Sequence, residues 1–161
     1  DPELMAQAAK YDPDNAHAWG SLADIALNEN KVDICLQHIE KARKLQPESK
    51  DWRLIEARAR KRKGEANEAL MLLVPLDASQ RREPQVVRLI AECYGMLGRQ
   101  TEAAAAIVDA SRADPTNADL AYDAATWLER SGNKAEAMMY AKQAEGLGHK
   151  DAVKLVKRLS Q

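Results

Sequence analysis

The sequence predicts an all-α solenoid built from helical hairpins, and three observations support this fold class. A unit of 34 residues, 16–49, returns at 50–83, 84–117 and 118–151 without a gap. Small and apolar residues recur at fixed places of the unit, and within it they follow the spacing of a helix face. Runs typical of strands are missing, and the sequence has no Phe. Self-similarity at this period is typical of repeat architectures, in which neighbouring units bury a continuous core.

Three places of the unit carry the same type of residue in every copy. Small residues at the eighth and twentieth places predict close approach of two helices, where a bulky side chain would cost about 1–3 kcal/mol. Gly or Asn at the fifteenth place predicts the end of the first helix, since both tolerate positive φ. The residues are Ala23, Ala57, Ala91 and Ala125 at the eighth place, Asn30, Gly64, Gly98 and Gly132 at the fifteenth, and Cys35, Ala69, Ala103 and Ala137 at the twentieth.

The first complete copy predicts both of its helices. Trp19 and Ala26 lie on one face of a first helix, and Cys35 and Ile39 lie on one face of a second helix. Pro47 ends the copy. Two helices of this length cannot cover their own apolar faces, so each copy has to pack against its neighbours.

Residues 1–15 carry a proline near their end, as the first complete copy does. Pro13 lies one period before Pro47, which predicts that Met5–Tyr11 is the second helix of a preceding, cut repeat. The chain opens on Asp1 without a starting Met, so we expect it to be an excerpt of a longer protein.

The second copy, 50–83, departs from the others. Glu56 and Arg60 stand where the other copies carry apolar residues, whereas Trp52 stands at a place that is apolar in all copies. One interpretation is a rotated first helix that buries Trp52, Ile55 and Ala59 and pairs Glu56 with Arg60 on a wetter face. The other is a polar opening in the stack.

Pro75 falls inside the second helix expected in this copy. Proline removes a backbone donor and clashes with the preceding turn, so it kinks or ends a helix. We therefore predict a short helix over 66–73 and an irregular segment over 75–83. Pro84 suits the first turn of the next helix.

The C-terminal segment, 150–161, predicts a helix that caps the last copy. Ala152, Leu155, Val156 and Leu159 form an apolar stripe, and the lysines lie mostly off it. A membrane-binding or calmodulin-type helix is the alternative interpretation.

These residues resemble the pattern of the tetratricopeptide repeat (TPR) family, with Ala in place of its Gly and Tyr. The resemblance covers nearly the whole chain, and the competing family is another array of helical hairpins, such as Sel1-like repeats, which are usually longer and less regular. The residues that carry it are Trp19, Leu22, Ala23, Ala26, Cys35, Ile39 and Pro47 in the first copy and Ile90, Ala91, Tyr94, Ala103, Ile107 and Pro115 in the third.

The resemblance implies one right-handed solenoid domain over 1–161, in which the first helices line a concave groove that holds a peptide or helix. Counting within each repeat gives the groove-facing places. They are His17, Ser21, Asp24 and Asn28, then Leu54, Ile55, Arg58, Lys61 and Arg62, then Arg88, Leu89, Glu92 and Met96, then Tyr122, Asp123, Thr126 and Arg130.

A partner-binding set follows from these places, with an apolar patch and basic neighbours. Such a surface suits an amphipathic protein segment with some acidic residues. The alternative is that rotation of the second copy buries Leu54 or Ile55, or that the groove is empty. The predicted set is Leu54, Arg58, Lys61, Arg62, Arg88, Leu89, Glu92, Met96, Tyr122 and Thr126.

The expected function is protein–protein interaction, as an adaptor or assembly scaffold. One alternative is a structural spacer or self-association segment. Another is binding of nucleic acid or an acidic partner through the basic run 58–63. The other interpretation of this run is a solvated helix end whose positive charges compensate the helix dipole. The Lys, Asn and Arg clamp of chaperone-binding TPR proteins has no match at the corresponding places, such as Gly20, Asp24 and Ile55.

No motif in the sequence indicates catalysis, a metal or a cofactor. His17, His38 and His149 are scattered and lack ligand spacing, and no phosphate loop or nucleophile elbow is present. Lys plus Arg is 24 and Asp plus Glu is 25, which gives no global attraction to nucleic acid or an anionic membrane.

We expect Cys35 and Cys93, two repeats apart, to be buried thiols. Buried thiols agree with a reducing compartment such as the cytoplasm, and a bacterial periplasm is the alternative. The Ala-rich and Arg-rich composition indicates a bacterial protein.

Overall fold

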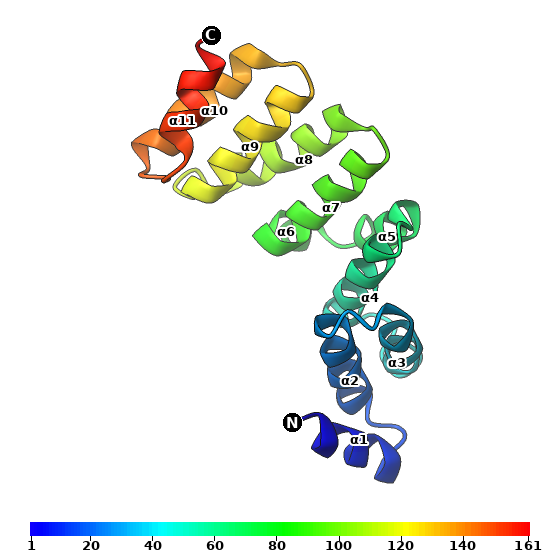
Figure 1. Ribbon diagram of the computed structural model, residues 1–161. Coiled ribbons are helices and arrows are strands. Elements are labelled where there is room, and N and C mark those ends of the chain that lie inside the picture. The colour runs from blue at the N-terminus through cyan, green and yellow to red at the C-terminus, as the bar shows by residue number, and fades with distance from the viewer. The chain divides into compact units, whose positions relative to one another are not determined.

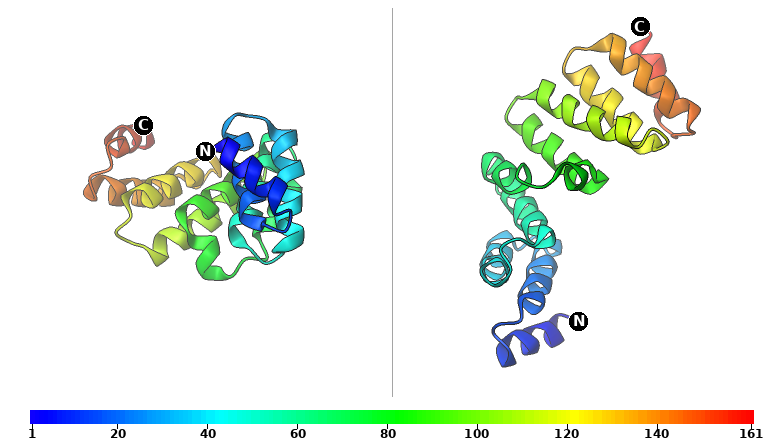
Figure 2. Two further views of the ribbon diagram at one scale, coloured as in Figure 1. Left: turned by 90° about the horizontal axis from the view of Figure 1, so that it is seen from below. Right: turned by 180° about the vertical axis from the view of Figure 1, so that it is seen from behind.

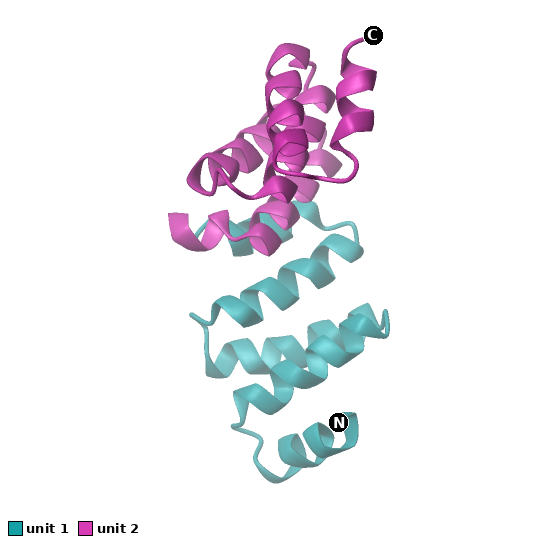
Figure 3. Cartoon of the chain, turned by 90° about the vertical axis from the view of Figure 1, so that its left-hand side faces the viewer, with its two compact units in different colours: residues 1–76 teal, residues 77–161 magenta.

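The computed structural model describes residues 1–161 and consists of helices joined by short turns, which confirms the all-α fold class (Figure 1). The chain divides into two compact units, residues 1–76 and residues 77–161, shown in teal and magenta in Figure 3. Each unit has its own hydrophobic core and is described by itself.

Unit 1 contains two helical hairpins and a preceding helix. Helix α2 packs on α3, and α4 packs on α5, while α3 and α4 connect the two hairpins. The N-terminal helix packs against α2, as Figures 1 and 2 show. The bounds are α1 (Pro2–Tyr11), α2 (Ala16–Asn28), α3 (Val32–Leu45), α4 (Lys50–Arg62) and α5 (Ala66–Leu73).

Unit 2 contains two further hairpins, a short helix before them and one helix after them. Helix α7 packs on α8, and α9 packs on α10, while α8 and α9 connect the hairpins. The bounds are α6 (Ala78–Arg82), α7 (Pro84–Met96), α8 (Gln100–Ala113), α9 (Ala118–Arg130), α10 (Lys134–Gly146) and α11 (Ala152–Leu159).

The first helix of every copy begins at the same place of the 34-residue unit. The side chains of Asn15, Ser49 and Asn117 cap α2, α4 and α9 by accepting a hydrogen bond from a backbone N–H in the first turn. Helix α7 lacks such a cap and begins with Pro84, which has no N–H to satisfy. Local chemistry therefore sets these helix starts.

The first helices also end as the fifteenth place predicts. Asn30 has φ +61° and is the only residue other than glycine with positive φ. Gly64, Gly98 and Gly132 have φ between +73° and +86° at the same place. The left-handed conformation turns the chain sharply from the first helix into the second.

All eight small residues at the eighth and twentieth places are fully buried. In unit 1, Ala23 and Cys35 belong to a core cluster with Leu27 and Ile39, against which Trp19 and Trp52 pack. In unit 2, the corresponding cluster includes Ala91, Ala103, Ala125 and Ala137. These small side chains lie where the two helices of each hairpin meet.

The second copy combines both interpretations of its irregular first helix. Ile55 and Ala59 are buried, and Trp52 is partly buried, as the rotated helix predicts. Glu56 pairs with Arg60 as expected, but the expectation of a wetter face is wrong, because the Glu56 side chain is only 12% exposed. It lies between Arg43 of α3, at 2.5 Å, and Arg60, at 3.3 Å. A charged cluster thus occupies a position that is apolar in the other copies.

Helix α5 covers the predicted residues 66–73, but the irregular segment predicted over 75–83 is only partly irregular. The Asp77 side chain accepts a hydrogen bond from the Gln80 N–H, and the Asp77 N–H donates a hydrogen bond to Gln80 Oε1. This capping box starts the five-residue helix α6. The prediction from Pro75 overlooked the capping signal of Asp77 and Gln80.

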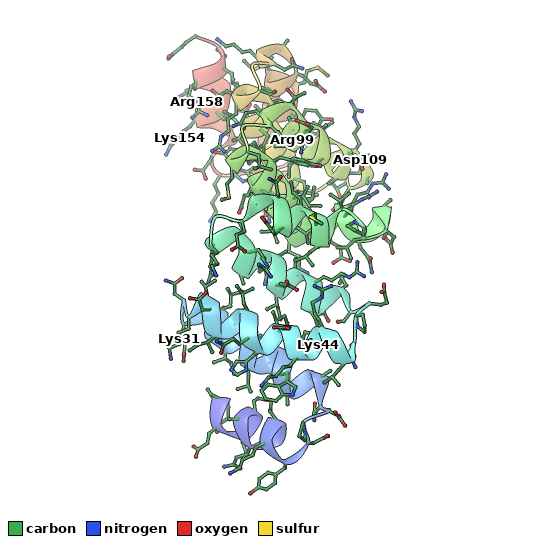
Figure 4. The ribbon with its side chains drawn as sticks, turned by 90° about the vertical axis from the view of Figure 1, so that its right-hand side faces the viewer. Lys31, Lys44, Arg99, Asp109, Lys154 and Arg158 are labelled. Carbon is green, nitrogen blue, oxygen red and sulfur yellow. The ribbon has the colours of Figure 1, made fainter.

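The predicted C-terminal capping helix is confirmed as α11. Its residues Ala152, Leu155 and Leu159 are buried, and the helix packs against α10 (Figures 1 and 2). Lys154 and Arg158 extend from its outer side (Figure 4). Arg158 forms an ion pair with Glu129 of α9 at 2.6 Å, which ties the helix to the last hairpin.

Candidate protein-binding surface

In unit 1, the predicted binding residues of α4 are largely engaged within the protein. Leu54 is 4% exposed and therefore offers no accessible apolar surface. Arg62 donates a hydrogen bond from Nη1 to the backbone carbonyl of Leu27, in the last turn of α2. Arg58 and Lys61 are half-buried and also have partners.

The rest of the basic run is paired as well. Arg60 donates to Glu65 at 2.8 Å and to Glu56, and these carboxylates raise the pKa of its guanidinium. Lys63 lies 3.0 Å from Asp33 of α3. The run therefore connects helices inside unit 1, and it presents little unpaired charge to a phosphate backbone.

In unit 2, two stripes of predicted residues face the same side. Arg88, Glu92 and Met96 repeat every four residues on α7, and Tyr122, Thr126 and Arg130 do so on α9. Arg88 forms an ion pair with Asp123 at 2.6 Å, which joins the two helices on this side. We call the face formed by these residues the α7/α9 face: Arg88, Glu92, Met96, Tyr122, Asp123, Thr126 and Arg130.

The α7/α9 face is partly fixed by its own contacts. Tyr122 stacks on His149, with ring centroids 4.1 Å apart and planes 7° apart. His149 Nε2 lies 3.4 Å from an oxygen of Asp119, and His149 Nδ1 accepts a hydrogen bond from the Asp151 N–H. The Thr126 hydroxyl donates to the backbone carbonyl of Asp123. The Tyr122 ring is therefore covered and positioned by contacts within unit 2.

The accessible apolar part of this face is smaller than predicted. Met96 is 50% exposed, whereas Leu89 is 5% exposed and does not reach the surface. Glu92 is exposed and has a partner within the protein. The face thus offers one flexible apolar side chain among polar groups that are held by contacts within the protein.

His149 and Asp119 were not predicted to belong to this surface. His149 stands at the place where two other copies carry Pro47 and Pro115. The change from Pro to His at this place of the repeat was the one sign in the sequence that His149 has a different role. Without the fold, nothing showed that the C-terminal turn returns over α9.

Two glycines on the first helices were not predicted to matter either. A Cβ added at Gly20 would lie 2.2 Å from the ring of Trp52, and one at Gly95 would lie 2.5 Å from the ring of Trp127. In both units, an indole from the first helix of one repeat therefore packs directly on the backbone of the preceding first helix. A bare backbone at these positions permits the close approach.

The side chains of Cys35 and His38 in unit 1 have shifted pKa values, but they do not form a metal site. No group of His, Cys, Asp and Glu could hold a metal ion. Burial, together with Asp24, raises the pKa of the Cys35 thiol to about 11, which disfavours the reactive thiolate. Burial lowers the pKa of His38, and the positive charge of Lys41 lowers it further. None of the helices has the length and apolar character needed to cross a membrane.

The chain shares its fold with TPR proteins of known structure. YrrB, described as a TPR protein with an unusual peptide-binding site, is 17% identical, with a TM-score of 0.74 over 97% of this chain and 81% of that one. A fragment of MamA from Desulfovibrio magneticus is 13% identical, with a TM-score of 0.80 over 91% and 82%. A thermophilic TPR protein from Thermus thermophilus is 20% identical, with a TM-score of 0.67 over 99% and 87%.

The sequence itself matches no protein-family model and no curated protein. The predicted TPR resemblance is confirmed by the fold, and the structures above extend over most of the chain.

Proposed function

We propose that this chain is a protein-interaction module, an adaptor or assembly scaffold, that binds a peptide or helix of a partner on the first-helix side of its repeats. The observation that carries the proposal is the α7/α9 face. There Met96 is exposed at the end of α7, two turns beyond Arg88, which pairs with Asp123, and Tyr122 of α9 is stacked on His149. Preordered polar groups reduce the entropy that binding costs.

The likeness to YrrB supports this proposal. That protein is described as having a peptide-binding site, and it shares the hairpin arrangement over nearly all of this chain. In unit 1 by itself, the first-helix side carries the half-buried cations Arg58 and Lys61 of α4, whereas Arg62 is engaged with the Leu27 carbonyl. The charge of Arg58 and Lys61 favours an amphipathic segment with acidic residues.

The internal pairing of the basic run argues against the nucleic-acid alternative. Arg60, Arg62 and Lys63 each have a partner inside unit 1, which a polyanion would have to displace. Each new contact of a polyanion with these side chains would therefore require an existing contact within unit 1 to break.

The test is selection of peptides from a random displayed library on the immobilised chain, followed by affinity measurement with a labelled peptide. The variant Met96→Glu replaces the exposed apolar side chain of the α7/α9 face by a charge. We expect it to weaken binding about tenfold, the equivalent of about 1.4 kcal/mol.

The matched control is Met139→Glu. Met139 is also an exposed methionine, but it lies on α10, a second helix of unit 2. It should leave the affinity unchanged, and circular dichroism should show the same helicity for both variants. If both variants bind like the parent, or lose binding equally, the α7/α9 face is not the binding surface.

A further inference from the structure

Two arginines of unit 2 stack on aromatic rings in the same way, but only one of them has a carboxylate partner. Arg99 lies over Tyr94, with its guanidinium carbon 4.7 Å from the ring centroid, and it also pairs with Glu102 at 2.8 Å. Arg130 lies over Trp127 at the same 4.7 Å. The Arg130 side chain is exposed and forms no ion pair within unit 2, so it lacks the carboxylate that Arg99 has.

The indole of Trp127 positions the guanidinium of Arg130. The ring packs on the hydrophobic core of unit 2 and lies against the backbone of Gly95, where an added Cβ would be 2.5 Å from it. A guanidinium stacked on an aromatic face keeps its N–H groups at its edge, where they can donate in pairs to a planar acceptor. The other copies carry smaller residues at the place of Trp127, namely Ile25, Ala59 and Cys93.

The charges next to Arg130 along α9 and α10 are mostly positive. Glu129, its neighbour on α9, accepts a hydrogen bond from Arg158 at 2.6 Å, and this bond lowers the pKa of the Glu129 carboxyl. The charges of Arg130 and of Lys134 in α10 lower it further. Three cations therefore act on one carboxylate, and that carboxylate is held by Arg158.

The carboxylates of the α7/α9 face are also engaged. Asp123 forms the ion pair with Arg88 at 2.6 Å, and Glu92 has a partner within the protein. Arg130 is therefore the cation of this face to which a further carboxylate can bind without breaking an ion pair of unit 2.

An exposed apolar side chain lies close to the same indole. Met96 directly follows Gly95, on which the Trp127 ring packs, and it is half exposed. A segment that places a carboxylate on Arg130 can therefore reach Met96 with a neighbouring apolar side chain.

We propose that Arg130, stacked on Trp127, selects the partner of the α7/α9 face by binding the carboxylate of an Asp or Glu side chain, while Met96 packs on an adjacent apolar side chain. This inference rests on the proposed function and names the chemistry of the bound segment. Charge complementarity favours this occupant. Because Arg130 covers one face of the indole and the ring packs on the core, little aromatic surface remains on which a nucleic-acid base could stack.

The test uses the whole chain and two synthetic tripeptides, Leu-Glu-Leu and Leu-Gln-Leu. Both are acetylated and amidated, so that the Glu side chain carries the only charge. Binding is followed by NMR through the indole N–H resonance of Trp127 and the methyl resonance of Met96. We expect Leu-Glu-Leu to shift both resonances and to bind about fivefold more tightly than Leu-Gln-Leu, the gain that one exposed ion pair gives.

The variant Arg130→Gln should remove this preference, so that the two peptides bind equally. The matched control is Arg99→Gln, which makes the same change in net charge at a stacked arginine that already has Glu102 as its partner. It should keep the fivefold preference, and circular dichroism should show the same helicity for both variants. Equal loss of the preference in both variants would overturn the proposal, since long-range charge would then account for it.

Three other results would also overturn it. If both peptides bind the parent equally and Met96→Glu weakens both, the face takes apolar segments without an acidic anchor, and the proposed function stands. If Leu-Glu-Leu shifts neither resonance at millimolar concentration, Arg130 does not bind a carboxylate, and the library-selected peptides still test the proposed function. If a short oligothymidylate shifts the same resonances as tightly and loses binding in Arg130→Gln, the face is a general anion site.

Discussion

The contact between Gly20 and Trp52 predicts that a substitution expected to strengthen a helix will weaken this protein. Gly20 lies inside α2, where alanine is normally favoured over glycine by about 1 kcal/mol. A Cβ at this position would meet the Trp52 ring at 2.2 Å, whereas ordinary contact begins at 3.4 Å. The ring would therefore have to retreat by about 1.2 Å.

The magnitude follows from what the retreat disrupts. Overpacking of this kind costs about 1–3 kcal/mol. Trp52 Nε1 donates to Gln46 Oε1 at 3.0 Å, and loss of that hydrogen bond adds up to about 1 kcal/mol. Set against the gain in helix propensity, Gly20→Ala should lower the free energy of unfolding by about 1–2 kcal/mol.

The assay is urea unfolding, followed by far-UV circular dichroism and Trp fluorescence. Gly146→Ala is the matched control, because Gly146 ends α10 and has no atom within 4 Å of an added Cβ. It should stabilise the protein by about 0.5–1 kcal/mol. In a Trp52→Leu background, Gly20→Ala should become neutral or stabilising, which assigns its effect to the ring. If Gly20→Ala stabilises the parent as much as Gly146→Ala does, the reasoning is refuted.

Three further predictions concern unit 1. Glu56→Ala should lower the free energy of unfolding by about 1–3 kcal/mol in urea titrations, because it leaves Arg43 without its carboxylate, and Arg43→Met/Glu56→Leu should recover most of the loss. If the double variant is no more stable than the single one, the charged cluster does not act as a pair. Because burial raises the pKa of the Cys35 thiol from 9.0 to about 11, unfolding releases a proton between these pH values, so stability should fall as pH rises from 9 to 11. Stability curves of the parent and Cys35→Ala should diverge in that window, and parallel curves would contradict the buried thiol. Asn30→Gly should raise the urea midpoint slightly and Asn30→Ala should lower the free energy of unfolding by about 1 kcal/mol, since φ is +61°, and equal midpoints would show that the turn relaxes.

The α7/α9 face was predicted in part. Counting within the repeat placed Arg88, Met96, Tyr122 and Thr126 on one side of the first helices, and the Arg88–Asp123 ion pair shows that the two stripes meet. The same counting could not reveal that Leu54 and Leu89 are buried. A helical period gives the direction of a side chain, but burial depends on how far the neighbouring element extends over it.

The fold class and the positions of the helices, apart from α6, were determined by the sequence alone, because they depend on local chemistry at a fixed period. Asparagine and serine caps, a left-handed turn at the fifteenth place and small residues at the helix contacts act within a few residues of one another. These signals repeat, so each copy supports the interpretation of the others.

The tertiary structure alone decided where the irregular parts lie and what they contact. Glu56 became a shared carboxylate only because α3 brings Arg43 to it, and His149 covers Tyr122 only because the chain returns over α9. These contacts join residues from different helices, and their free energy depends on packing that no single stretch of sequence encodes.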